Sequence, residues 1–365
     1  MKIDGTATRT IWVNDDGWSV GIIDQTRLPH ALVRETLSDL DQAAHAIRAM
    51  LVRGAPLIGA TAAYGLALAM RANASDAALA GAYDTLLATR PTAVNLRWAL
   101  DDMRGLLADT PPDGRAAAAY RRAAAICDED VAINAAIGDH GLDLIRQAAA
   151  RRPAGRPVNV LTHCNAGWLA TVDWGTATAP IYKAHDRGIP VHVWVDETRP
   201  RNQGASLTAY ELGHHGVAHT VIADNTGGHL MQHGMVDLCI VGTDRTTRTG
   251  DVCNKIGTYL KALAARDNAV PFYVALPSPT IDWTIRDGLA EVPIEQRSGD
   301  EVARISGRAD DGRIVTVQAC HRTAARSPTM PSTSRRRLVT GLITERGICP
   351  ATADGLAALF PDRAA

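Results

Sequence analysis

Short apolar runs alternate with longer amphipathic stretches in the second half of the chain, after Arg156-Pro157. Each gap between the runs is long enough for a crossover helix, and this alternation is typical of a parallel sheet covered by helices. The runs are residues 158–161 (VNVL), 191–195 (VHVWV), 220–223 (TVIA), 237–242 (DLCIVG) and 272–276 (FYVAL). We therefore expect residues 151–365 to form a Rossmann-like domain of the α/β class, with a doubly wound, mostly parallel sheet.

The first 150 residues are patterned mostly as helices. Between residues 37 and 51, apolar side chains recur at the three- and four-residue spacing of a helix face. Pro56 suits the first turn of a second helix, and further helices are predicted from residue 90 and over residues 114–150. Residues 10–29 predict a strand and a turn instead. Since the length of the chain favours two domains, we predict a mostly helical N-terminal domain over residues 1–150.

Polar or reactive side chains follow the predicted strands. Open α/β sheets bind ligands outside the carboxyl ends of their strands, so these side chains are expected to line a common site. They are Cys164, Asp196-Glu197, Asp224-Asn225, Asp244-Arg245 and Pro277-Ser278. A cysteine and a row of charged groups at such an edge indicate an enzyme that acts on a small molecule.

Composition and charge narrow the choice of partners. The chain has 365 residues, 46% of them hydrophobic, and a net charge of -1, so no global field attracts nucleic acid or an anionic membrane. The sequence contains no run of about twenty apolar residues and no signal-peptide pattern. Its six cysteines lack CxxC or metal-finger spacing. We therefore expect a cytoplasmic protein with reduced thiols, with no nucleic-acid or membrane partner and no metal site.

Cys164 is the first candidate for catalysis, because it follows a buried-looking strand and precedes a predicted helix. Backbone N–H groups and the helix dipole at such a place would lower the pKa of the thiol. The alternative is an inert buried cysteine, and the sequence leaves both open. His163 is adjacent, and neighbours on an extended chain point to opposite faces, so a dyad of these two residues is not expected.

Asp244 is the second candidate, two residues past Gly242 at the end of an apolar strand. Burial by its neighbours would raise the pKa of its carboxyl group and suit it to general acid catalysis. The alternative is a helix cap or a partner for Arg245.

Three short segments have the composition of a phosphate site: Arg53-Gly54-Ala55, Arg90 and Asn254-Lys255. Glycine allows close approach of the backbone, helix starts offer free N–H groups, and Arg or Lys supplies charge. The chain has no GxGxxG after the first strand of the sheet and no GxxxxGK[ST], so a dinucleotide or P-loop nucleotide is not expected.

The ordered motifs of the chain resemble those of the methylthioribose-1-phosphate isomerase family. This family shares a superfamily with the regulatory subunits of the translation-initiation guanine-nucleotide exchange factor. The resemblance runs from about residue 9 to residue 317 and resumes over residues 338–360. The motifs that carry it include VRGAPLIG (52–59), RPTAVNL (90–96), LTHCNAG (161–167), DETRPRNQGASLTAYEL (196–212), VGTDR (241–245) and GDVCNKIGTY (250–259).

The resemblance implies an activity and a set of site residues. The family isomerises 5-methylthioribose 1-phosphate, a small-molecule sugar phosphate, to 5-methylthioribulose 1-phosphate in methionine salvage. It acts as a homodimer and needs no metal or organic cofactor. Cys164 then matches the catalytic cysteine and Asp244 the proton donor. The positions that match substrate contacts are Arg53, Gly54, Ala55, Arg90, Gln203, Asn254 and Lys255.

Other functions stay open at this point. A sister isomerase for 5-deoxyribose 1-phosphate or ribose 1,5-bisphosphate would differ in the pocket near C5. A non-catalytic regulatory subunit of the same superfamily would have no need for both Cys164 and Asp244.

Residues 318–337 depart from the family pattern. They lack apolar periodicity and are rich in Arg, Ser, Thr and Pro. One choice of codons for Pro328 to Arg336, read out of frame from the third base, encodes Asn-His-Ala-Val-Asp-Val-Thr-Pro, close to the family's motif at this place. We therefore favour a pair of compensating frameshifts over ordinary divergence, and we expect the segment to pack poorly if it is real in the protein. An inactive enzyme is then a further possibility.

Overall fold

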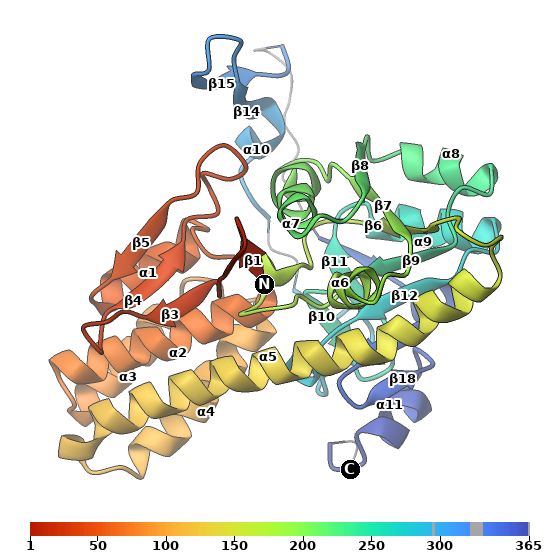
Figure 1. Cartoon of the computed structure of the whole chain (residues 1–365). Helices are drawn as coiled ribbons and strands as arrows, with labels where there is room; N and C mark the ends of the chain where they lie inside the picture. The colour runs from red at the N-terminus through yellow and green to blue at the C-terminus, as the bar shows by residue number, and fades with distance from the viewer. Residues whose placement is uncertain (294–295, 322–330, 364–365) are drawn as a thin grey trace.

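A seven-stranded sheet forms the centre of the computed structural model, which describes residues 1–293, 296–321 and 331–363 (Figure 1). Its strand order is β18-β17-β12-β9-β6-β7-β8, and all neighbours are parallel except β17 and β18. The strands are β6 (Val158–Thr162), β7 (Val191–Asp196), β8 (His219–Ile222), β9 (Leu238–Val241), β12 (Phe272–Ala275), β17 (Gly341–Thr344) and β18 (Gly347–Cys349). The predicted fold class and the five predicted strands are confirmed.

The strands alternate their side chains between two apolar cores, one on each face of the sheet. Val160 and Ile240 point into one core, which also contains Ile181 and Tyr182 of α6. Leu161 belongs to the other core. This period of two lets an inner strand such as β9 (LCIV) be apolar throughout, because both of its faces are covered. The covering helices are α6 (Ala179–Asp186), α7 (Ala209–His215), α8 (Thr226–Gln232), α9 (Thr258–Asp267) and α11 (Ala353–Leu359).

The N-terminal part is mostly helical, as predicted, but it also carries a small antiparallel sheet. Its helices are α1 (Leu40–Arg48), α2 (Ala55–Ala72), α3 (Asp76–Leu87), α4 (Val94–Ala108) and the first half of α5 (Pro112–Ala150). Its strands are β3 (Ile11–Val13), β4 (Val20–Ile23) and β5 (Arg34–Leu37), with a separate pair formed by β1 (Lys2–Ile3) and β2 (Thr6–Ala7). The predicted strand within residues 10–29 is therefore a hairpin of two.

Helix α5 joins the two parts of the molecule. Its first half packs into the N-terminal core through Ala119 and Ile126, and its second half packs beneath the large sheet through Ile137 and Ile145. In Figure 1 it is the long yellow helix that runs from α2–α4 to the sheet. The predicted domain boundary near residue 150 coincides with the end of this shared helix and stays a prediction.

A second sheet, which the sequence did not predict, lies beside the first. Its order is β13-β10-β11-β16, from β13 (Ile281–Asp282), β10 (Arg245–Thr247), β11 (Val252–Lys255) and β16 (Pro331–Ser334). The antiparallel pairing of β10 with β11 places Arg245 opposite Cys253. Residues 244 and 254 are thereby brought to the same end of the hairpin.

The unusual segment 318–337 is described only in part, since residues 322–330 lie outside the described residues. Residue 318 is the last residue of β15 (Ile314–Gln318), which pairs with β14 (Arg304–Arg308) in an antiparallel hairpin. At the other end, β16 pairs with β11, and the Arg335 guanidinium lies 3.1 Å from Asp251 and 3.0 Å from Asp287. This end of the segment is therefore tied to its surroundings by backbone pairing and by ion pairs, and the expectation that the segment packs poorly stays a prediction. The frameshift itself stays a prediction that the gene sequence decides.

One local misfit remains in this segment. The side chain of Ser334 is buried, and its Oγ atom has no hydrogen-bond partner. A buried hydroxyl without a partner costs stability because water solvated it in the unfolded chain.

Among the described helices, none combines the length and the apolar character that crossing a bilayer requires.

We expect Ser334→Ala to raise the free energy of unfolding by about 1 kcal/mol, since it removes the unpaired hydroxyl and leaves a cavity smaller than a methyl group. Urea unfolding followed by circular dichroism measures the change. Ser332→Ala is the control, because the Ser332 hydroxyl donates to the Lys255 carbonyl oxygen at 3.4 Å. A destabilised Ser334→Ala protein would contradict the assignment of a misfit.

Candidate active site

The site lies where the strand order of the large sheet reverses. From β6 the chain continues through β7 and β8 on one side, and from β9 through β12 and β17 on the other. The crevice between β6 and β9 is thus the switch point at which open α/β sheets bind ligands. Cys164 follows β6 and Asp244 follows β9, and both line the same cavity.

This inner cavity collects most of the residues predicted from the sequence. The predicted residues that line it are Arg53, Gly54, Ala55, Cys164, Asp244 and Asn254. The first three come from the loop before α2 and its first turn, so the N-terminal part supplies one wall. Asn165 and Thr243, which the sequence did not single out, also line the cavity.

Two neighbouring cavities hold the remaining predicted residues. Arg90 and Lys255 line a cavity that shares Gly54, Ala55 and Asp244 with the inner one. Gln203 lines a third cavity, of about 670 Å³, which shares Arg53 with the inner one. Gln203 and Cys164 therefore line different cavities.

The inner cavity alone is too small for a sugar phosphate. Its volume is about 30 Å³, and that of the cavity with Arg90 is about 90 Å³. Sites for small organic ligands have volumes of roughly 300–1,000 Å³. A ligand that contacts Cys164 must therefore extend toward the adjoining cavities, or the walls must move apart to admit it.

The backbone at Cys164 is held in an unusual conformation by two threonines. Its φ is 68°, in the left-handed region that few non-glycine residues adopt. The Cys164 N–H donates to Oγ1 of Thr198 at 2.8 Å, and Oγ1 of Thr208 donates to the Cys164 carbonyl oxygen at 2.8 Å. These bonds fix the direction of the thiol toward the cavity, as in other strained active-site positions.

The predicted lowering of the Cys164 pKa is wrong. No α-helix follows the residue directly, since only the 3₁₀ turn η1 (Trp168–Ala170) precedes α6. Burial raises the pKa of the thiol, and the nearby charges of Arg53 and Lys255 oppose that effect without overcoming it. The thiol therefore stays protonated at neutral pH.

The expectation that Asp244 is buried is also wrong, because its side chain is exposed at the cavity. The alternative that it pairs with Arg245 fails as well, since the Arg245 guanidinium lies 2.8 Å from the Asp282 carboxylate. The Asp244 N–H donates to the Cys253 carbonyl oxygen at 2.9 Å, which ties the residue to β11. The carboxyl group is thus left facing the shared wall of two cavities.

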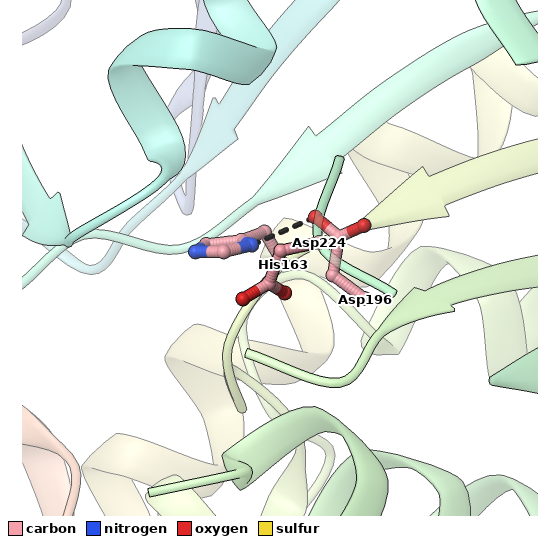
Figure 2. A group of neighbouring side chains, drawn as sticks. All are labelled: His163, Asp196 and Asp224. Carbon is pink, nitrogen blue, oxygen red and sulfur yellow. Dashed lines mark hydrogen bonds and ion pairs between the residues drawn. The ribbon is translucent and has the colours of Figure 1, made fainter. Parts of the chain in front are cut away.

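His163 points away from Cys164, as predicted. Figure 2 shows its ring against Asp196, with Nδ1 2.7 Å from the carboxylate, and Nε2 lies 2.8 Å from the Ile256 carbonyl oxygen. The Lys261 ammonium lies 3.1 Å from the same Asp196 oxygen. His163 and Asp196 are fully buried, so a buried network of polar contacts anchors the loop that begins at residue 163.

In the part of the chain that the structure describes, His163, Asp196 and Asp224 are the one group whose ligand atoms are close enough for a metal ion, within 4.8 Å. The geometry does not favour one. Both ring nitrogens of His163 already lie within hydrogen-bond distance of a protein oxygen, 2.7 Å from the Asp196 carboxylate and 2.8 Å from the Ile256 carbonyl. The Lys261 ammonium already brings a positive charge to Asp196. We assign this group a structural role.

Glu211 on α7 is the main residue that sequence reasoning missed. It is fully buried, and burial raises its pKa to about 7 against the opposing effect of hydrogen bonds from Asn165, Leu169, Tyr182 and Trp168. Its signal in the sequence is a lone carboxylate in an otherwise apolar and small-residue stretch, SLTAYELG.

Two glycines of the motifs are explained by close approach. A Cβ at Gly167 would lie 1.7 Å from Oε2 of Glu211. A Cβ at Gly54, whose φ is 93°, would lie 2.3 Å from the Ala170 carbonyl oxygen. The loop after β6 therefore packs against both Glu211 and the start of α2 only because these positions lack side chains.

A cysteine and an aspartate on one cavity at a switch point, beside several cationic side chains, are typical of an α/β enzyme that acts on a small molecule. Residues 51–351 match the model of the initiation factor 2 subunit family. The methylthioribose-1-phosphate isomerase of Rhodospirillum rubrum is 66% identical over 368 residues, which cover 100% of this chain and 94% of that protein. The chain belongs to the initiation factor 2 subunit family and, within it, to the methylthioribose-1-phosphate isomerases. The family resemblance inferred from the motifs is confirmed.

Solved structures agree with this assignment. The crystal structure of 5-methylthioribose 1-phosphate isomerase from Pyrococcus horikoshii OT3 has a TM-score of 0.82 and 37% identity, and covers 99% of this chain and 100% of that chain. The structure described as translation initiation factor eIF-2B subunit delta from A. fulgidus has a TM-score of 0.79 and 36% identity, and covers 97% of this chain and 100% of that chain.

We expect alkylation of Cys164 by iodoacetamide to show a pH midpoint above the ordinary thiol pKa of about 8.5, because burial disfavours the thiolate. Lys255→Met should move the midpoint higher still, since the Lys255 charge lowers the pKa. Mass spectrometry of the Cys164 peptide measures the rate, with Lys2→Met, a remote exposed lysine, as the control. A midpoint below 8.5 would contradict this account of the thiol.

Proposed function

We propose that this chain is an aldose–ketose isomerase that converts 5-methylthioribose 1-phosphate to 5-methylthioribulose 1-phosphate in methionine salvage. The observation that carries the proposal is the shared cavity of Cys164 and Asp244 at the switch point of the sheet. The names of relatives that match this chain over its whole length support the substrate.

The start of α2 is a suitable place for the phosphate of the substrate. Gly54 is the N-cap of this 18-residue helix and makes no side-chain capping bond; Pro56 in the first turn has no N–H, so the Ala55 N–H is the first one that the helix offers to an anion. Arg53 stands beside them, and Arg90 and Lys255 line the adjoining cavity. We propose that these groups, with Asn254, hold the phosphate and thereby orient C1 and C2 of the sugar. Gln203 would contact the far end of the ligand, past Arg53.

Ring opening comes first in the proposed reaction, because the anomeric phosphate locks the sugar as a furanose. Asp244 donates a proton to the ring oxygen as the bond between that oxygen and C1 breaks. The electron-poor C1 then receives hydrogen from C2, and as the carbonyl forms at C2 its hydroxyl proton passes to the Asp244 carboxylate, which restores the acid. The position of Asp244 on the cavity wall would let it reach the ring oxygen in this first step.

The hydrogen moves either as a proton, with a Cys164 thiolate as base, or as a hydride. The raised pKa of the Cys164 thiol leaves little thiolate at neutral pH, which favours the hydride route. The buried surroundings of Cys164, including Trp168, exclude water and thus suit the hydride route. In that route the thiol shields and orients the reacting carbons.

A regulatory subunit of an exchange factor is the second candidate, because a structure described as such a subunit is 36% identical to this chain. A scaffold has no need for a reactive thiol and an acid on one cavity. We also propose a cytoplasmic homodimer, as the resemblance implies. The six free cysteines fit a reducing compartment, and light scattering measures the mass of the assembly.

Purified protein should convert 5-methylthioribose 1-phosphate, and Asp244→Asn should lower kcat by roughly 10²–10⁴-fold, the contribution of a positioned acid. Cys164→Ser should also lower kcat, because a smaller and more polar hydroxyl shields and orients the reacting carbons less well than the thiol does. Phosphorus NMR follows the conversion, and circular dichroism checks that the fold is intact. Asp267→Asn, which changes an exposed carboxylate at the end of α9 and outside the three cavities, is the control for Asp244→Asn. Near wild-type kcat in either variant would refute the assigned role.

We expect the product formed in deuterated water to carry no solvent deuterium at C1, as a direct hydride shift requires. Proton NMR of the C1 methylene group measures the incorporation. Full incorporation of solvent deuterium at C1 would establish proton transfer by a Cys164 thiolate. It would also contradict our conclusion that this thiol is protonated at neutral pH.

A further inference from the structure

Glu211 does not line any of the three cavities, yet it accepts hydrogen bonds from the loop that forms one of their walls. Its Oε1 atom accepts from Nδ2 of Asn165 at 2.8 Å and from the Leu169 N–H at 2.9 Å. Its Oε2 atom accepts from the Trp168 N–H and the Tyr182 hydroxyl, both at 3.0 Å. Four donors converge on one buried carboxylate, which is the arrangement that an acceptor-only group satisfies best.

The carboxylate fixes which way the Asn165 amide faces. Its Nδ2 atom donates to Glu211 and to Oγ1 of Thr208 at 3.2 Å, so Oδ1 must point the other way. There Oδ1 accepts from Nη1 of Arg53 at 2.5 Å, and the Asn165 carbonyl oxygen accepts from Nη2 at 2.9 Å. Two hydrogen bonds to Asn165 therefore hold the Arg53 guanidinium, and together they fix both its plane and its position.

We propose that Glu211 is a positioning residue, which holds Arg53 through Asn165 in the orientation that binds the substrate's phosphate. This inference rests on the proposed function only in taking the ligand to be phosphorylated. Gly167 supports it, since a side chain there would collide with the Glu211 carboxylate. The chain thus leaves room for the carboxylate at the point where the loop turns toward Arg53.

A purely structural role for Glu211 makes a different prediction. In that case its loss would lower stability, and the activity of the remaining folded protein would be unchanged. If Glu211 positions Arg53, its loss weakens phosphate binding in the ground state and the transition state alike, so KM rises while kcat stays near the wild-type value.

The test is Glu211→Gln, assayed by steady-state turnover of 5-methylthioribose 1-phosphate and by calorimetric binding of inorganic phosphate. The Gln amide must direct two hydrogens toward donors, and it no longer fixes the Asn165 amide. We expect KM and the Kd for phosphate each to rise about tenfold, with kcat within about threefold of wild type. Phosphate binding does not depend on isomerisation, so a wild-type protein that binds phosphate without turning over would refute the proposed function and not this inference.

Two variants serve as controls. Tyr182→Phe removes one donor to Oε2 and leaves the bond to Asn165, so KM should stay at the wild-type value. Asp130→Asn changes a second carboxylate whose pKa burial raises to about 7, although its side chain is only half-buried. It accepts from the Val172 N–H at 2.8 Å and from Asn134 at 3.0 Å, with no link to Arg53, so it should lower stability without raising KM.

Unchanged KM and phosphate affinity in a folded Glu211→Gln protein would overturn the proposal, and so would an equal rise in KM in Asp130→Asn. If Glu211→Gln does not fold, Glu211→Asp takes its place. The Asp side chain keeps the carboxylate but is one methylene group shorter, so the carboxylate lies farther from Asn165. We therefore expect about a threefold rise in KM and in the Kd for phosphate. Wild-type values of both quantities in Glu211→Asp would then contradict the proposal.

Discussion

The buried pair between the His163 ring and the Asp196 carboxylate, 2.7 Å apart, anchors the loop on which the site is built. Taking these groups out of water is costly, and the cost is met only because each has further partners: the Ile256 carbonyl oxygen for His163 and the Lys261 ammonium for Asp196. The pair ties the end of β6 to the end of β7 and to the turn between β11 and α9. Cys164 is the next residue, so its position follows from this interaction.

The same loop is held at its far end by Glu211, so two buried charged groups fix the segment between residues 163 and 169. Between them the backbone can adopt the strained conformation at Cys164 and present Asn165 to Arg53. Because Arg53 belongs to the N-terminal part, this contact also joins that part to the large sheet. The loop after β6, Arg53 and Asp244 thus lie together around the switch point.

The sequence predicted the large sheet well, because strands buried on both faces are continuous apolar runs. It did not predict the second sheet, since its strands RTT (245–247) and VCNK (252–255) are short, polar and without alternation. Cys164 and Asp244 were identified, but their environments were not. The protonated thiol and the exposed carboxyl group result from tertiary packing of distant segments. Glu211 was missed for the same reason: its partners at residues 165–169 and 182 are far away in the sequence.

The central claim is that the site isomerises a 1-phosphorylated 5-methylthio sugar. Its most direct test is kcat/KM of the purified chain for 5-methylthioribose 1-phosphate beside 5-deoxyribose 1-phosphate, followed by NMR. The account predicts conversion of the first to 5-methylthioribulose 1-phosphate with the higher kcat/KM. No conversion of either sugar by folded protein, or a clear preference for 5-deoxyribose 1-phosphate, would contradict it.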